Sequence, residues 1–246
     1  MNAHATSPLL GLGLYPLREA ARLVQLPTRV ARRWALGYDY SYRGVVRHSP
    51  GVMALTDRQS EGEPVLTFAE MLTLRLVKGF REAKLSLSTI KRVAEVAARE
   101  YGTATPFVSR RFRTDGRRVF VELQQEPIPG DEPARLPRER KMIEVLTGQH
   151  AFADVVEPSL FANVDWQDDM AARWWPLGRT RAVVLDPAIV FGSPRIMHTR
   201  VPTATLAQAV RAEGDGDEAI GAVADWYSVT VDQVRDALDF ETAWLH

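Results

Sequence analysis

A short basic segment near the N-terminus has the residue types and the spacing of a surface that binds nucleic acid. The segment TRVARRWAL over residues 28–36 contains no acidic residue. In a helix its polar positions share one side, because residues three or four apart are neighbours on the helix surface. These positions are Thr28, Arg29, Arg32 and Arg33. Arginine binds guanine edges and phosphate oxygens, so the segment predicts DNA contact; a solvated basic face is the alternative.

Two short helices joined by a tight turn would position this segment. Residues 16–23 (PLREAARL) have apolar positions at helical spacing, VQLP follows as a break, and the second helix ends near Gly37. This is the helix-turn-helix pattern, in which the second helix enters the major groove. The next segment, YDYSYRGVVRHSPG, predicts strands and a turn. It suits a wing whose Tyr40, Arg43 and Arg47 contact DNA, although the tyrosines could instead pack under the domain.

The rest of the chain predicts further helices and few strands. A capping box of Thr67 and Glu70 begins a helix over 67–79, and another helix is expected over 88–101. Residues 107–108 and 119–123 are expected to pair as a hairpin around TDG. A strand at VVLDP precedes helical patterns over 203–212, 217–225 and 230–240. The last two form a second helix-turn-helix candidate, but its final helix is acidic and is therefore expected to pack or dimerise.

Charge separates the chain into two halves. Its 246 residues have a net charge of zero, yet residues 1–123 hold 20 Lys and Arg against 11 Asp and Glu, and the second half has the reverse balance. The sign changes within the proline-rich stretch QQEPIPGDEPARLP at 124–137, which predicts a linker. Such asymmetry suggests that the first half meets a polyanion. Two unrelated exposed surfaces would also produce it.

Composition argues against several classes of protein. The chain has no cysteine, which excludes disulfide scaffolds, thiol nucleophiles and thiolate metal sites. No apolar run is long enough for a membrane span, and the first residues lack a basic signal-peptide region, so a cytoplasmic protein is expected. No nucleophile elbow, phosphate-binding loop or dinucleotide fingerprint is present. Asp165, Asp168 and Asp169 would be the carboxylates of a metal-dependent hydrolase, but an acidic helix start is the preferred interpretation.

Residues 181–241 resemble a known small domain. The resemblance is carried by Asp186–Pro187, Gly192, Pro194, the Thr199-Arg200-x-Pro202 motif, and the later positions Tyr227, Val229, Val234 and Ala237. These features are similar to the antitoxin-associated domain of family 433 of the domains of unknown function. That family usually has a glycine before the Thr-Arg pair, and this chain has His198 there.

The N-terminal part resembles the winged helix-turn-helix of the MerR class, and the whole order resembles the longer VapB-type antitoxins. The resemblance implies a homodimer that binds its own promoter and neutralises a PIN-domain ribonuclease toxin. The resemblance also implies that DNA is bound by five positions of this chain, which are Thr28, Arg29, Arg32, Arg33 and Arg43. Many such antitoxins end in an arginine-bearing tail, whereas this chain ends in DFETAWLH. The toxin contact is therefore expected in RWWPLGRTR, at Arg173, Trp174, Trp175, Arg179 and Arg181, unless both tryptophans are core.

Together these patterns predict a mainly α protein with small β elements. Residues 1–123 would form the basic winged helix-turn-helix domain, residues 124–180 a linker and irregular connection, and residues 181–246 an acidic helical domain. The predicted function is autoregulation with toxin neutralisation, by binding and without catalysis, cofactor or metal. The alternative is a MerR-like regulator without a toxin, in which Trp166, Trp174 and Trp175 line a pocket for a small ligand.

Overall fold

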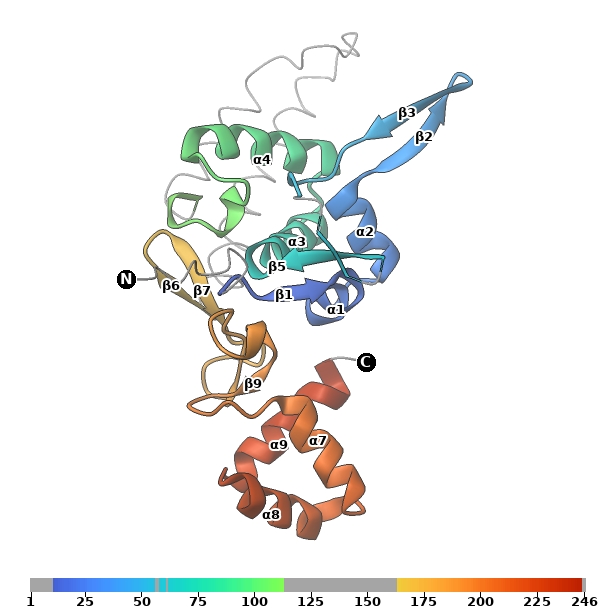
Figure 1. Ribbon diagram of the computed structural model, residues 1–246. Coiled ribbons are helices and arrows are strands. Elements are labelled where there is room, and N and C mark those ends of the chain that lie inside the picture. The colour runs from blue at the N-terminus through green and yellow to red at the C-terminus, as the bar shows by residue number, and fades with distance from the viewer. Residues whose placement is uncertain (1–10, 56–57, 61, 113–162, 245–246) are drawn as a thin grey trace, which may run out of the picture.

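The computed structural model describes residues 11–55, 58–60, 62–112 and 163–244 of an elongated, mainly helical protein with small antiparallel sheets, as the sequence predicts. A β-hairpin projects from one end, and three helices form the other end (Figure 1). In the described part of the chain, none of the helices combines the length and the apolarity that crossing a membrane requires.

The N-terminal part contains four helices and two small sheets among its described residues. Its helices are α1 (Leu17–Leu23), α2 (Thr28–Leu36), α3 (Phe68–Glu82) and α4 (Leu87–Tyr101), followed by the 3-10 turn η1 (Pro106–Val108). Its strands are β1 (Leu14–Pro16), β2 (Tyr38–Tyr42), β3 (Val45–Ser49), β4 (Gln59–Ser60) and β5 (Glu63–Thr67). The strand β5 lies between β1 and β4, and β2 pairs with β3 alone. Both pairings of β5 are antiparallel.

The C-terminal part begins with short strands and ends in helices. The strands are β6 (Val164–Gln167), β7 (Met170–Trp174), β8 (Val183–Val184) and β9 (Arg195–Ile196), with the 3-10 turn η3 (Val190–Gly192) before β9. The helices are α7 (Thr203–Ala212), α8 (Gly216–Tyr227) and α9 (Val231–Asp239), and α9 continues into the π-helical turn η4 (Phe240–Trp244). These three helices confirm the helical patterns predicted for this part.

Local sequence explains where the helices begin. At the start of α3, the Thr67 hydroxyl accepts a hydrogen bond from the Glu70 amide, and the Glu70 carboxylate accepts one from the Thr67 amide. This is the predicted capping box. A second box, made by Thr230 and Gln233, begins α9. The buried apolar residues of α3 and α4 then form the centre of the N-terminal core, with Phe80 packed edge-on against Phe107.

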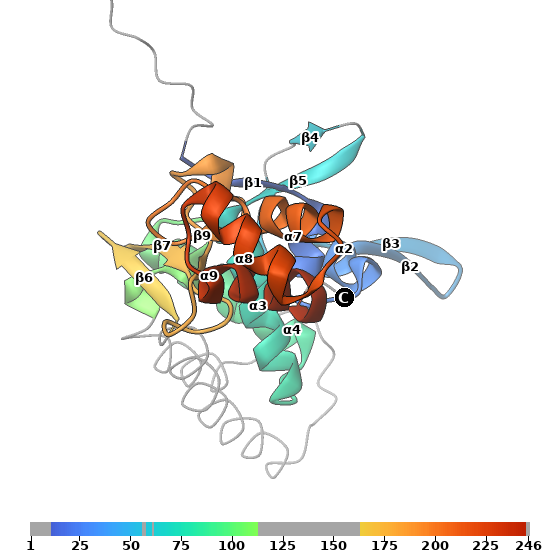
Figure 2. The same cartoon turned by 90° about the horizontal axis from the view of Figure 1, so that it is seen from below.

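The two ends of the chain meet at one junction. The Tyr15 hydroxyl, in β1, donates a 2.7 Å hydrogen bond to the carbonyl oxygen of Gly192 in η3. The turn η4 returns to the N-terminal part, where Trp244 lies against α1. One buried apolar cluster runs across this junction and includes Tyr15, Trp174 and Phe240. Seen from below, α7, α8 and α9 lie in front of the N-terminal helices (Figure 2).

Two local expectations are wrong. Residues 164–174 form the β6–β7 hairpin where an irregular connection was expected, because Val164 and Trp174 face each other and are buried together. Residues 107–108 belong to η1 and not to a strand, since Pro106 begins a 3-10 turn that buries Phe107 beside α3. The other strand of that expected hairpin, at 119–123, lies outside the described residues, as does all of the expected linker at 124–137.

Candidate nucleic-acid interface

Helix α2 presents its basic side to solvent. Ala31 and Ala35 are its buried residues, and they hold the opposite side against the core. The four predicted contact positions, Thr28, Arg29, Arg32 and Arg33, are all exposed. Pro27 precedes the helix, no side chain caps the helix start, and no acidic residue lies in the first turn. The helix therefore offers cations and the positive end of its dipole to an anionic partner.

The β2–β3 hairpin begins directly after α2 because two glycines allow the backbones to meet. Gly37 has a φ of 86°, and a Cβ there would overlap the carbonyl oxygen of Ser49. A Cβ on Gly51 would overlap the carbonyl oxygen of Ala35. This close approach sets the base of the hairpin against the end of α2. The predicted wing is thus attached to the predicted recognition helix.

Aromatic and cationic groups join α2, the hairpin and α4. The Arg33 guanidinium lies 3.7 Å from the centre of the Tyr38 ring, a cation–π contact. Hydrogen bonding to Arg33, and then to Ser49, lowers the pKa of the Tyr38 hydroxyl. Lys91 of α4 donates a 2.8 Å hydrogen bond to the Ser49 hydroxyl. Lys91 was not expected at this surface, because only the packing of α4 brings it beside the hairpin.

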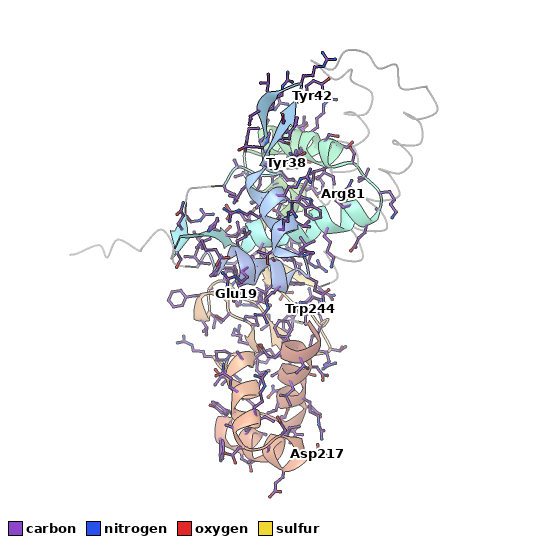
Figure 3. All side chains as sticks on the ribbon, turned by 90° about the vertical axis from the view of Figure 1, so that its right-hand side faces the viewer. Glu19, Tyr38, Tyr42, Arg81, Asp217 and Trp244 are labelled. Atoms are coloured by element: carbon purple, nitrogen blue, oxygen red, sulfur yellow. The ribbon has the colours of Figure 1, made fainter. Side chains whose placement is uncertain are left out.

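The hairpin carries an exposed face of tyrosine and arginine. Tyr40 and Tyr42 are 41% and 48% exposed, so neither packs under the domain. The guanidinium groups of Arg43 and Arg47 each lie 5.3 Å from the centre of the Tyr42 ring. Tyr38 lies at the base of the hairpin and Tyr42 lies farther out along it (Figure 3). We call the exposed side of α2, this hairpin and Lys91 the basic face.

The turn of the hairpin is strained. Arg43 and Gly44 occupy its two central positions with φ values of 51° and 79°. Both values are positive, as a tight two-residue hairpin turn requires, and glycine or asparagine suits such positions best. Arginine at Arg43 therefore places a cation at the tip at a conformational cost.

The segment expected to contact a toxin is mostly used inside the protein. Trp174 is completely buried in the core, so its assignment as an interface anchor is wrong. Arg181 pairs with Asp236 and Asp239 of α9, which binds this segment to the C-terminal helices.

The other three predicted toxin contacts are more accessible. Trp175 is partly buried and donates a hydrogen bond to Asp165, and Arg179 also pairs with Asp165. Arg173 is exposed and pairs with Asp186.

The three aspartates considered for metal binding have other positions than expected. Asp168 and Asp169 form the turn between β6 and β7, so they do not begin a helix. Asp165 is engaged by Trp175 and Arg179. Among the described residues, no group of three or more histidine, aspartate or glutamate side chains is arranged to hold a metal ion.

Two family models match the chain. Residues 13–94 match the model described as "Putative DNA-binding HTH domain". Residues 183–240 match the model described as "Protein of unknown function (DUF433)". These matches confirm the resemblances expected for the two parts of the sequence.

Curated relatives extend over nearly the whole chain. "Putative antitoxin VapB45" from Mycobacterium tuberculosis is 30% identical and covers 92% of each chain. "Uncharacterized protein Rv2308" from the same organism is 25% identical and covers 96% of this chain and 93% of its own. The crystal structure of Rv2018 from that organism matches with a TM-score of 0.69 at 24% identity, over 94% of this chain and 99% of the other. The fold of the described part of the chain is therefore shared with a solved protein.

Proposed function

The chain belongs to the family of the "Putative antitoxin VapB45", and from this premise we propose that it is an antitoxin that binds promoter DNA through the basic face. Helix α2 would lie in the major groove, and the β2–β3 hairpin would contact the adjacent phosphates. In a homodimer, two α2 helices about 34 Å apart would reach successive major grooves. A homodimer bound to the promoter would exclude RNA polymerase from that DNA.

One observation carries the DNA-binding part of this proposal. Arg29, Arg32 and Arg33 are exposed on a helix that has no acidic residue, and the hairpin continues their charge outward. The other helix-turn-helix candidate is poorly suited to bind DNA, because phosphate groups would repel the acidic side chains of its second helix, α9. Asp236 and Asp239 instead bind Arg181, and Asp236 also accepts the Ala182 amide.

Fluorescence anisotropy would test the proposal on duplex DNA from immediately upstream of the gene. We expect sequence-preferring binding that weakens on the order of a thousandfold between roughly 50 and 200 mM salt, as six or more phosphate contacts would give. Arg29→Ala with Arg33→Ala should abolish the preference over random duplex. Arg211→Ala with Arg235→Ala removes the same charge from the C-terminal helices and should change little. Equal losses in both double variants would contradict a specific role for α2.

The toxin and dimer parts need separate measurements. Light scattering should give twice the 27.6 kDa chain mass for a homodimer. The proposal implies that a PIN-domain ribonuclease is encoded beside this gene, and co-expression with that protein should yield a stable complex in which RNA cleavage is suppressed. Arg173→Glu and Arg179→Glu test the contact surface, because both side chains are exposed. An active ribonuclease that never co-purifies would overturn neutralisation and leave DNA binding intact.

A further inference from the structure

A pocket of about 430 Å³ lies in the C-terminal part, away from the basic face. One part of its wall comes from Arg173 at the end of β7, from Trp175 just after that strand, and from Val184 in β8. Another part comes from the loop that follows β9. Its lining residues are Arg173, Trp175, Val184, Ile189, Arg195, Met197, His198, Thr199 and Arg200. The pocket therefore combines an apolar wall with several cationic side chains.

Positive charge exceeds negative charge around this pocket. Asp186 is the carboxylate that binds both Arg173, at 2.8 Å, and Arg195, at 3.4 Å. Arg200 adds a third guanidinium, for which no carboxylate partner occurs among the described residues. Three arginines thus line the pocket, and Asp186 pairs with only two of them, so the excess of positive charge favours an anionic occupant.

Arg195 brings this charge into the interior. Its side chain is only 5% exposed, and it holds the loop by donating hydrogen bonds to the carbonyl oxygens of Ile196 and Thr199. Its buried Nε–H has no acceptor in the part of the chain that the structure describes. Burial lowers the pKa of the guanidinium, and nearby Arg173 lowers it further, while Asp186 opposes both. A second anion would relieve this electrostatic imbalance.

His198 is placed at the pocket despite a conformational cost. Its φ is 62°, in the left-handed region that favours glycine. Its imidazole is exposed and has no hydrogen-bond partner among the described residues, so no local contact explains the choice of residue. Strain at a lining residue points to a role in binding.

We propose that this pocket binds a small organic anion, with the carboxylate or phosphate held by Arg173, Arg200 and His198. The apolar body of the ligand would lie against Trp175 and the aliphatic wall. Arg195 is a positioning residue, since it shapes the loop and supplies a buried positive charge. This site is separate from the basic face and does not depend on the proposed DNA binding.

Three probes of nearly the same shape test the charge requirement. Benzoate is anionic, benzamide is neutral and benzamidine is cationic. Ligand-detected NMR with the full-length chain should show benzoate binding with a Kd on the order of millimolar, typical of so small a ligand. Benzamide should bind at least tenfold more weakly, and benzamidine should not bind. Equal binding of benzoate and benzamide, or no benzoate binding, would overturn the proposal.

Two variants separate a ligand role from a structural one. Arg200→Ala should weaken benzoate binding at least fivefold without changing the melting temperature, because its side chain is exposed. His198→Gly should also weaken binding while raising the melting temperature by a few degrees, because glycine relieves the strain. Arg211→Ala, outside the pocket, is the control. Unchanged benzoate binding in both pocket variants would mean that benzoate binds elsewhere on the protein, and it would overturn the proposal that this pocket is the anion site.

Competition by inorganic phosphate and a measurement of DNA affinity test whether the pocket prefers a small organic anion to other anions. Phosphate should compete with benzoate more weakly than a second aromatic carboxylate does, because it lacks an apolar body. Stronger competition by phosphate would overturn the role of the apolar wall. A loss of DNA affinity in Arg200→Ala as large as that in the α2 variants would instead assign the pocket to a polyanion surface, and it too would overturn the proposal.

Discussion

The indole N–H of Trp244 donates a 2.8 Å hydrogen bond to the carbonyl oxygen of Leu23, 221 residues earlier in the chain. Leu23 is the last residue of α1, where helix carbonyls have no partner within the helix. The Trp244 ring also stacks on Phe240 and meets Trp174 edge-on. The C-terminal turn therefore supplies a hydrogen-bond donor to the end of α1, the first helix of the N-terminal part (Figure 3).

Trp244→Phe tests this connection. Phenylalanine keeps part of the ring stacking but has no donor for the Leu23 carbonyl, so the free energy of unfolding should fall by about 1–2 kcal/mol. Urea denaturation followed by circular dichroism would measure the loss. Trp226→Phe is the matched control, because Trp226 is 60% exposed and its replacement should change stability by less than about 0.5 kcal/mol. Similar losses in the two variants would contradict the connection.

Gly192→Ala tests the contact between η3 and β1. Gly192 has a φ of 88°, and an added Cβ would overlap the Tyr15 hydroxyl. We expect destabilisation of more than about 2 kcal/mol, since backbone strain and overpacking act together. Gly214→Ala is the control, because Gly214 has a φ of 99° but open space around it, and only strain should appear. The difference between the melting temperatures of the two variants measures the contribution of the steric overlap with Tyr15. Equal melting temperatures would contradict that contribution.

Arg43→Asn tests the strained hairpin turn. Asparagine tolerates a positive φ, so the variant should be as stable as the parent or slightly more stable. If the proposed DNA binding is correct, loss of one cation should weaken binding and reduce the salt dependence by about one phosphate contact. Anisotropy and thermal unfolding would be measured together. Weaker DNA binding accompanied by unfolding of the domain would contradict a contact role for Arg43.

Glu19→Gln tests the junction between α1 and the C-terminal part. Glu19 and Glu241 line a cleft of about 480 Å³ there. Loss of hydration, with a further contribution from the Glu241 carboxylate, raises the pKa of Glu19 above its ordinary value, and Arg22 opposes this shift.

The direction of the pH dependence follows from linkage. A carboxyl group whose pKa is higher in the folded state stabilises the fold below its unfolded pKa, and this contribution is lost as the pH rises through the folded pKa. Glu19→Gln should therefore raise the melting temperature at pH 7 more than at pH 4. Thermal unfolding at both values would measure the difference, with Glu95→Gln as control because Glu95 is a surface glutamate that does not line this cleft. A gain confined to pH 4 would contradict the raised pKa.

Local patterns predicted many elements because their causes lie within a few residues. The Thr67–Glu70 capping box begins α3 as expected, and the alternating YDYSYRGVVRHS segment forms the β2–β3 hairpin. The predictions failed where distant packing decides. Trp174 looked like a surface anchor beside several arginines, but its pairing with Val164 and its packing against Trp244 bury it.

The sequence by itself determined the helices, the hairpin after the basic helix, and the separation of charge between the two halves. These follow from side-chain periodicity, capping and composition, which act over short distances. Only the tertiary structure decided that Lys91 lies beside the hairpin base and that Trp244 caps α1. The tertiary structure also decided that Asp186 forms ion pairs with both Arg173 and Arg195 beside the C-terminal pocket. Such contacts join residues far apart in the chain, and burial of the shared core places them together.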